Sequence, residues 1–240
     1  MNAEKLSMRL TAVAKYVPKE ARLADIGSDH AYLPSYLVKN AGITFAVAGE
    51  VAKGPYQSAK SNVMAEGLSD RISVRMGDGL EVIESGEIDC ITIAGMGGAL
   101  IASILENGKE KLETVKRLVL QPNISAISIR LWFLENEWEL IAEEILEEDG
   151  KTYEILVAEK GNAKRPYQKN KMEMELLMGP FLIQNQNEIF KKKWLSESSN
   201  WERVKKQLEN AAATPETVEK RKEIEDKLKL VEVALKIEKS

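Results

Sequence analysis

Three acidic residues, Asp25, Glu50 and Asp78, each stand at or just after the end of a short apolar run that has the length of a strand. Because the carboxyl ends of parallel strands meet at one edge of a sheet, we expect the three carboxylates to gather there. Glu50 follows Asp25 by 25 positions, close to the spacing at which an acid binds the ribose hydroxyls of a nucleotide. Each acid alone could be only a cap or a turn residue, but three in register favour a binding site.

The loop after the first run, Asp25-Ile26-Gly27-Ser28-Asp29-His30-Ala31, does not suit a phosphate. A dinucleotide fingerprint needs G-x-G-x-x-G so that the backbone can close on a pyrophosphate. Here only Gly27 is present, with Asp29 at the second glycine position and Tyr32 at the third. A carboxylate would repel phosphate, so the loop favours a ligand that carries positive charge.

S-adenosylmethionine is such a ligand, since it has a sulfonium, an amino group and no phosphate. Asp25 could accept a hydrogen bond from the amino group directly or through water, and Gly27 would let the backbone approach. Glu50 would bind the ribose hydroxyls, and Asp78 the amino group of the adenine. This arrangement of acidic side chains favours S-adenosylmethionine over NAD.

Alternating strand and helix patterns must position these residues. An amphipathic helix carries Leu6, Leu10, Val13 and Val17 and ends at Pro18. We predict strands over residues 21–26, 43–49, 72–76, 88–94, 118–120 and 153–157, and helices over 34–41, 55–67, 99–112 and 125–136. This alternation predicts an α/β fold with a mostly parallel, doubly wound sheet in a first domain, residues 1–160.

Residues 161–240 no longer show the alternation of strand and helix patterns. A basic linker is followed by a helical seam of Phe190, Trp194, Trp201, Val204, Leu208 and Ala211, and later by a second seam of Ile224, Leu228, Val231 and Leu235. The spacing predicts two long helices folded back as an α-helical coiled-coil hairpin, with both tryptophans in its core. The seam can close within one chain, giving a monomer, or exchange between two copies.

Composition excludes several classes. One cysteine, Cys90, and one histidine, His30, cannot form an internal disulfide or an ordinary His/Cys zinc site, so we expect no metal. No apolar stretch has the length of a membrane span, and the start has no signal-type core, so we expect a cytoplasmic protein without membrane contact. Cys90 lies in an apolar strand and should be inert core.

Four separated motifs resemble the TrmK family, whose members are bacterial tRNA adenine-22 N1-methyltransferases. The motifs are Asp25-Ile26-Gly27-Ser28-Asp29-His30-Ala31-Tyr32-Leu33-Pro34, Ala48-Gly49-Glu50-Val51 with Gly54-Pro55-Tyr56-Gln57-Ser58-Ala59, Ile93-Ala94-Gly95-Met96-Gly97-Gly98, and Leu120-Gln121-Pro122-Asn123. The resemblance extends from about Lys5 through Gly161 and implies a class I, Rossmann-like methyltransferase that uses S-adenosylmethionine and carries a C-terminal coiled coil. The cofactor site would comprise Asp25, Gly27, Asp29, His30, Glu50, Gly77, Asp78, Gly79, Ala94, Gly95 and Met96.

The residues that contact the target base are less directly indicated by the resemblance. Many adenine N-methyltransferases carry an Asn-Pro-Pro-Tyr-like tetrapeptide after the fourth strand, where this chain has Ala94-Gly95-Met96-Gly97. Adenine N1 has a free lone pair once the base is unpaired, so orientation should dominate catalysis, and a paired base must first be flipped out. We expect Asp29 to stabilise the cationic product or to accept from adenine N6, unless it serves only the cofactor. Further candidate base contacts are His30, Gln121 and Asn123.

Basic residues form a candidate tRNA surface. Residues 160–206 contain 11 basic and 5 acidic side chains, so the overall net charge of −4 does not exclude nucleic acid. The candidates are Arg9, Lys160, Lys164, Arg165, Lys169, Lys171, Lys191, Lys192, Lys193, Lys205 and Lys206. Arg9, near the amino terminus, would meet a phosphate close to the target nucleotide. The alternative is that these runs of charged residues only keep the surface of a coiled coil hydrated.

Other functions remain open on the residues alone. A methyltransferase could act on a protein or a small molecule, although the basic linker argues against this. The coiled coil could recruit a partner while a degenerate nucleotide site acts as a sensor, which the intact acids oppose. A dinucleotide oxidoreductase is the weakest alternative because the phosphate-binding glycines are missing.

Overall fold

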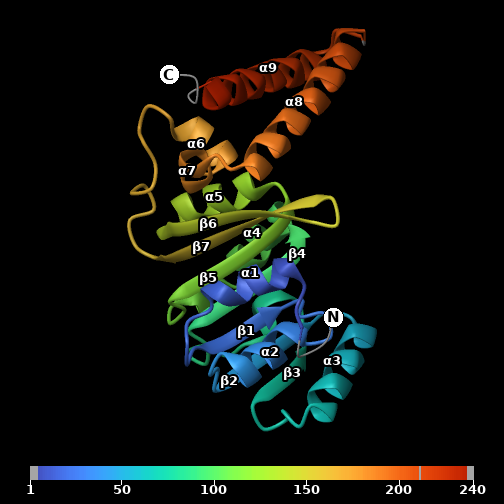
Figure 1. Cartoon of the computed structure of the whole chain (residues 1–240), viewed down its shortest axis with the longest axis vertical. Coiled ribbons are helices and arrows are strands. Elements are labelled where there is room, and N and C mark those ends of the chain that lie inside the picture. The colour runs from blue at the N-terminus through green and yellow to red at the C-terminus, as the bar shows by residue number, and fades with distance from the viewer. Residues whose placement is uncertain (1–4, 211, 237–240) are drawn as a thin grey trace. The chain divides into compact units, whose positions relative to one another are not determined.

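The apolar runs of the first two-thirds of the chain assemble into one sheet. The computed structural model describes residues 5–210 and 212–236, and within them it contains a sheet of seven strands in the order β3-β2-β1-β4-β5-β7-β6 (Figure 1). The strands are β1 (Arg22–Ile26), β2 (Phe45–Glu50), β3 (Ile72–Met76), β4 (Cys90–Gly97), β5 (Arg117–Ile124), β6 (Trp138–Glu148) and β7 (Lys151–Lys160). β1 to β5 pair in parallel, whereas β7 pairs antiparallel with β5 and β6. The predicted doubly wound, mostly parallel sheet is confirmed.

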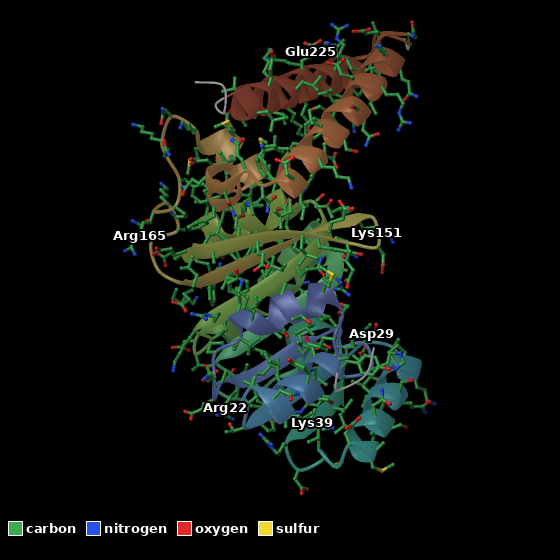
Figure 2. All side chains as sticks on the ribbon, viewed as in Figure 1. Arg22, Asp29, Lys39, Lys151, Arg165 and Glu225 are labelled. Carbon is green, nitrogen blue, oxygen red and sulfur yellow. The ribbon has the colours of Figure 1, made fainter. Side chains whose placement is uncertain are left out.

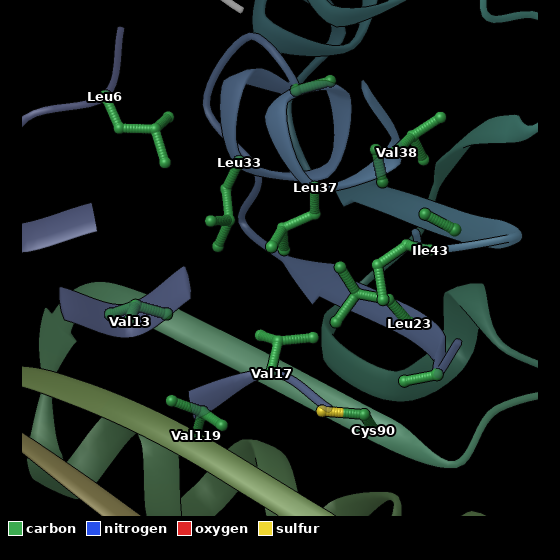
Figure 3. Close-up of a cluster of buried hydrophobic side chains, with 14 of the residues drawn as sticks. Leu6, Val13, Val17, Leu23, Leu33, Leu37, Val38, Ile43, Cys90 and Val119 are labelled. Atoms are coloured by element: carbon green, nitrogen blue, oxygen red, sulfur yellow. The ribbon is translucent and has the colours of Figure 1, made fainter. Parts of the chain in front are cut away.

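Helices cover both faces of this sheet. They are α1 (Met8–Tyr16), α2 (Tyr32–Asn40), α3 (Lys53–Ala65), α4 (Gly98–Asn107) and α5 (Ala126–Glu135), with short 3-10 helices at Gly79–Val82 and Lys109–Leu112. Val13 of α1 and Leu37 of α2 belong to one buried cluster with Leu23, Cys90 and Val119 of the strands (Figure 3). The next residues along the central strands, such as Ile91, are equally buried, as expected for strands between two helical layers. α4 and α5 pack on each other and contact β5 and β6, respectively.

The sequence patterns did not predict β6. This strand joins β7 through Asp149 and Gly150, which both have positive φ, as a two-residue hairpin turn requires. A register shift between Leu140 and Ala142 interrupts the alternation of buried and exposed residues. The irregular pattern hid the strand, but the Asp-Gly pair was a usable signal for the turn.

Residues from Tyr167 onward form a second unit of helices. Its described elements are α6 (Met172–Met178), α7 (Pro180–Asn185), α8 (Glu188–Glu209) and α9 (Pro215–Lys236). Lys205 of α8 lies 3.9 Å from Glu225 of α9, and Lys227 lies over the ring of Trp201, so the two long helices run antiparallel (Figure 1). The predicted hairpin is therefore present, whereas α6 and α7 were not predicted separately. Ala211 of the predicted seam lies outside the described residues.

The first unit extends to Pro166, beyond the boundary expected at residue 160. The Gly161 N–H donates to the Glu137 carbonyl at 3.1 Å, and the Asn162 N–H donates to Glu139 Oε2 at 3.1 Å. Arg165, whose side chain points outward in Figure 2, pairs with Glu139 at 3.0 Å. These contacts attach the basic segment to the β6–β7 hairpin. No helix among the described residues is long and apolar enough to span a membrane.

Candidate active site

A cavity of about 280 Å³ opens where the sheet changes winding direction, between the carboxyl ends of β1 and β4. Such switch points are where doubly wound folds bind their ligands, because the loops that follow the two strands diverge. The cavity is lined by Arg9, Leu10, Asp25, Gly27, Ser28, Asp29, Leu33, Ala94, Gly95, Met96, Asn123 and Tyr153. The structure thus brings together residues from both predicted groups, cofactor-binding and catalytic.

Asp25 forms the floor of this cavity and is 3% exposed. Ser28 Oγ donates to Asp25 Oδ2 at 2.6 Å, and Thr92 Oγ1 donates to Oδ1 at 2.6 Å. Burial raises the pKa of the Asp25 carboxyl, while the two hydroxyl groups and the charge of Arg9 oppose that rise. The hydroxyl groups fix both oxygens, so Asp25 is a pre-oriented acceptor. Neither Ser28 nor Thr92 was predicted, although a lone threonine between Ile91 and Ile93 was an available signal.

The loop after β1 takes a shape that few sequences adopt. Gly27 has φ +69°, and a Cβ there would lie 2.2 Å from Met96 Cε, so any other residue would be strained and would have to displace Met96. Asp29, His30 and Ala31 also have positive φ, a conformation that costs non-glycine residues about 1 kcal/mol each. The N–H groups of Gly27 and Ser28 donate to the Gly49 carbonyl of β2, which holds the loop. Strain maintained by surrounding contacts is a feature of functional loops.

Asp29 and His30 are the accessible side chains of that loop. The Asp29 side chain is 76% exposed (Figure 2), and His30 Nε2 lies 3.5 Å from Asp29 Oδ1. The His30 ring stacks on Tyr32, with 5.4 Å between ring centroids. Asp29 borders the cavity, whereas His30 is not among its lining residues.

Glu50, at the end of β2, is 6% exposed. Burial raises the pKa of its carboxyl, and a backbone hydrogen bond from Asp29 partly opposes this. Its Oε1 is buried and has no hydrogen-bond partner among the described residues. An unpaired buried carboxylate oxygen is costly, so this atom suits a hydroxyl donor from a ligand.

Asp78 does not reach the first cavity. It lines a second one of about 240 Å³, with Gly79 and Ile104 among the other walls, and its N–H donates to Glu81 Oε2 at 3.0 Å. The Gly77 N–H donates to the Glu50 carbonyl at 3.0 Å, so β3 does end beside β2 as predicted. The three acids therefore share one edge of the sheet, but only Asp25 borders the main cavity.

The irregular end of β4, where the register shifts between Ala94 and Met96, is held by two amide side chains of β5. Gln121 Oε1 accepts from the Gly95 N–H at 3.0 Å, and Asn123 Nδ2 donates to the Gly95 carbonyl at 2.7 Å. Gly95 has φ +83°. Gln121 is fully buried, while Asn123 is exposed and lines the cavity. The geometry therefore opposes the expected base contact by Gln121, since its amide is covered, and leaves Asn123 accessible.

Arg9 lies in the cavity wall rather than on an outer surface. Its Nη1 donates to Gln121 Oε1, and its guanidinium lies over the ring of Tyr153, 5.5 Å from the centroid. The expected contact with a phosphate thus has to compete with these partners. Tyr153 was not predicted as a site residue, because only the unpredicted β6–β7 hairpin brings it to this edge.

The remaining basic candidates are distributed along both units. In the first, Lys160 lies over the Trp138 ring at 4.3 Å, burial lowers its pKa, and Lys164 is exposed. In the second unit, Lys191 pairs with Glu188 at 3.1 Å and Lys193 lies over Trp194 at 5.0 Å. Lys169, Lys192 and Lys206 are exposed, while Lys171 and Lys205 are half-buried. Trp194 is 3% exposed, which confirms its place in the core.

Two further expectations concerned metal binding and the single cysteine. Among the described residues no group of three or more His, Cys, Asp or Glu side chains could hold a metal ion. Cys90 is fully buried, and burial raises the pKa of its thiol, so the reactive thiolate is disfavoured.

Known proteins resemble this chain over nearly its whole length. The sequence profile of the TrmK family, tRNA (adenine(22)-N(1))-methyltransferase, matches residues 23–233. The tRNA (adenine(22)-N(1))-methyltransferase of Bacillus subtilis is 52% identical over 231 residues, which cover 96% of this chain and 97% of the relative. The crystal structure of the B. subtilis m1A22 tRNA methyltransferase TrmK superposes with a TM-score of 0.92 at 51% identity, covering 96% of this chain and 99% of that one. A Streptococcus pneumoniae protein solved in complex with S-adenosyl-L-methionine superposes with a TM-score of 0.85 at 42% identity, covering 96% and 100%.

Proposed function

The chain belongs to the TrmK family of tRNA (adenine(22)-N(1))-methyltransferases, and from this premise we propose how its residues direct methyl transfer from S-adenosylmethionine to N1 of adenine 22 in tRNA. The fold is that of a class I methyltransferase. The observation that carries the proposal is the buried, pre-oriented Asp25 carboxylate in a cavity at the switch point of the sheet.

The residues at this edge fit S-adenosylmethionine. The cofactor supplies an electrophilic methyl group on a sulfonium centre. Asp25 would hold its amino group, and the unpartnered Oε1 of Glu50 suits a ribose hydroxyl. Gly27 lets the side chain of Met96, which lines the cavity, approach the backbone of the β1 loop. Asp78 and its neighbours Gly77 and Gly79 would contact the adenine of the cofactor from the end of β3, with Ala94, Gly95 and Met96 opposite.

Asn123 and Asp29 are the proposed contacts of the target adenine. Asn123 donates one N–H to the Gly95 carbonyl and accepts from Gln121 Nε2 at 3.3 Å, so its amide orientation is set before a base arrives. Its second N–H and the second lone pair of Oδ1 can bind adenine at N7 and N6, the usual pairing of asparagine with this base, while N1 stays free. A preset contact of this kind orients N1 for transfer, which is the main catalytic requirement.

The exposed carboxylate of Asp29 would stabilise the positive charge that the adenine acquires at N1. It borders the same cavity as Asn123, on the side of the β1 loop. If Asp29 serves only the cofactor, Asp29→Asn will weaken cofactor binding and leave the rate at saturation unchanged. A loss in rate with cofactor binding preserved supports the role at the base, and His30 beside it is the second residue to test.

The second unit is the proposed contact surface for the body of the tRNA. α8 displays Lys191, Lys192 and Lys193 within about one helical turn, and residues 160–171 add further basic side chains. Phosphate contacts of this kind are sequence-independent and weaken steeply with salt. Because α8 packs on α9 of the same chain, we propose a monomer that acts in the cytoplasm, where its tRNA substrate is.

A methylation assay tests the proposal directly. Purified protein, labelled S-adenosylmethionine and unmodified tRNA should yield N1-methyladenosine at position 22, and Asp25→Ala should abolish the label while a tRNA lacking that adenine accepts none. Cofactor binding without transfer to tRNA would overturn the assignment of the acceptor.

A further inference from the structure

A relay of hydrogen bonds links Arg9 to the proposed base contact. Arg9 Nη1 donates to Gln121 Oε1, and Gln121 Nε2 donates to Asn123 Oδ1 at 3.3 Å and to the Pro122 carbonyl at 2.8 Å. Asn123 Nδ2 in turn donates to the Gly95 carbonyl at 2.7 Å. The relay therefore runs from a cation on α1, through two amides of β5, to the backbone at the irregular end of β4.

The groups at the ends of this relay fix the direction of its bonds, because the guanidinium can only donate and the Pro122 and Gly95 carbonyls can only accept. A guanidinium has donors and no acceptor, so it can face only the oxygen of the Gln121 amide. The nitrogen of that amide then faces Asn123, which must present its oxygen in return, and the Asn123 nitrogen is directed to Gly95. The Gly95 N–H also donates to Gln121 Oε1, at 3.0 Å, which reinforces the same orientation. Without Arg9, only one of the two donors to Gln121 Oε1 remains.

Arg9 is itself held in place from both ends of its helix. The backbone N–H groups of Met8 and Arg9 donate to the Glu148 carboxylate, which also favours the helix N-terminus electrostatically. At the other end, Lys15 and the Tyr16 hydroxyl donate to Glu144 at 2.8 and 2.9 Å. Both glutamates belong to β6, so one strand fixes the whole of α1 above the cavity. The Tyr153 ring of β7 supports the guanidinium itself.

We propose that Arg9 is a positioning residue that sets the orientation of the Gln121 and Asn123 amides, and thereby the edge that Asn123 presents to the target adenine. This inference rests on the proposed function and is an alternative to the expectation that Arg9 binds a tRNA phosphate. Gln121 acts in the same way, through Asn123, and does not touch the base.

Two variants separate positioning from phosphate binding. Arg9→Met removes the charge and the relay together. Gln121→Glu keeps an acceptor for Arg9 and for the Gly95 N–H but can no longer donate to Asn123. In both, kcat should fall by about 10- to 100-fold, the scale expected when a reacting group is misplaced. The KM for tRNA, the salt dependence of tRNA binding and the cofactor affinity at pH 8 should stay at their wild-type values. Lys19→Met removes the same charge from an exposed position just after α1, outside the cavity, and is the matched control.

Other outcomes overturn the inference. A phosphate contact predicts that Arg9→Met raises the KM and lowers the slope of log K against log salt by about 0.7–0.9, with kcat preserved. A cofactor contact predicts weaker cofactor binding, with kcat restored at saturation. Unchanged kinetics in either variant would also contradict the relay. If Arg9→Met fails to fold by circular dichroism, Gln121→Glu, which keeps the arginine, decides. Failure of wild-type protein to methylate tRNA would instead refute the proposed function.

Discussion

Thr92 and Asp25 face each other across the switch point of the sheet, where the register of β1 and β4 pairs them and Thr92 Oγ1 donates a 2.6 Å hydrogen bond to Asp25 Oδ1. β2, which follows β1 in the chain, pairs with the opposite edge of β1. The contact between β1 and β4 therefore joins residues that are 67 positions apart. A hydroxyl in an otherwise apolar strand thus stabilises the ionised form of the carboxylate proposed to hold the cofactor.

As the pH is lowered, a Thr92→Val variant should lose its affinity for the cofactor at a higher pH than the wild type does. Burial already raises the pKa of Asp25, and the Thr92 hydroxyl opposes the rise, so its removal raises the pKa further. Since the ionised carboxylate binds the amino group, affinity is present above this pKa and is lost as the pH falls through it. Calorimetric titrations with S-adenosylmethionine across the acid range measure the shift. Asp25→Asn, which cannot ionise, is the control, and coincident profiles for wild type and Thr92→Val would contradict the assignment.

Two glycine substitutions should separate backbone strain from blockage of the site. Gly27 and Gly42 both have positive φ, so alanine at either position should cost about 1 kcal/mol of unfolding free energy. A Cβ at Gly27 also meets Met96, which lines the cavity, whereas a Cβ at Gly42 has no atom within 4 Å. We therefore expect both variants to lose stability in urea denaturation but only Gly27→Ala to lose cofactor affinity. Equal cofactor binding by the two variants would show that Met96 moves aside freely.

Arg130 should be among the most sensitive positions for stability. It is fully buried and forms ion pairs with Glu143 and Glu154, both at 2.6 Å. Arg130→Met leaves two carboxylates buried without this cation, and removal of one partner from such a group costs about 3–5 kcal/mol. Lys15→Met, which breaks a pair at a 63% exposed side chain, should cost no more than about 1 kcal/mol. The difference between their urea midpoints checks this, and similar midpoints would mean that the buried carboxylates are relieved by protonation.

The lysines of α8 should contribute to tRNA binding through charge alone. Lys192→Ala with Lys193→Ala should lower the slope of log K against log salt by about 0.7–0.9 for each phosphate that these lysines neutralise in the wild type. The rate at saturating tRNA should not change. Lys220→Ala with Lys222→Ala removes the same charge from exposed positions of α9 and tests whether the effect is local. Equal decreases in the two pairs would indicate a general effect of net charge instead of a contact surface on α8.

Local patterns were sufficient for most of the sheet, because strands such as β3 are short apolar runs bounded by turn residues. They also placed Asp25 and Glu50 at one edge, since that follows from parallel pairing alone. Local patterns could not predict in which direction a side chain points. Whether Arg9 points to solvent or inward depends on Gln121, 112 positions away, and whether Asp78 reaches the main cavity depends on the turn after β3.

β6 is the clearest failure, and it had consequences for the site. A bulge breaks its alternation, so the period-2 pattern that marks a strand is absent. Without β6, the two glutamates that hold the ends of α1 are missing, and there is no reason to expect Tyr153 at the cavity. Sequence patterns therefore located the loop after β1 that borders the cavity but missed the wall that Tyr153 forms.

The attachment of α1 to the β6–β7 hairpin also determines when the enzyme becomes competent during its synthesis. The first helix leaves the ribosome early, yet Met8 and Arg9 find their carboxylate partner 140 and 139 residues later. Until the hairpin emerges, α1 lacks the carboxylates that hold both of its ends and Arg9 lacks the Tyr153 ring beneath its guanidinium. During most of its elongation the nascent chain therefore has the loops proposed to bind the methyl donor but lacks the hairpin that completes the cavity. Contacts of such long sequence separation form late and slow folding, so a released chain should acquire affinity for the cofactor before it acquires activity.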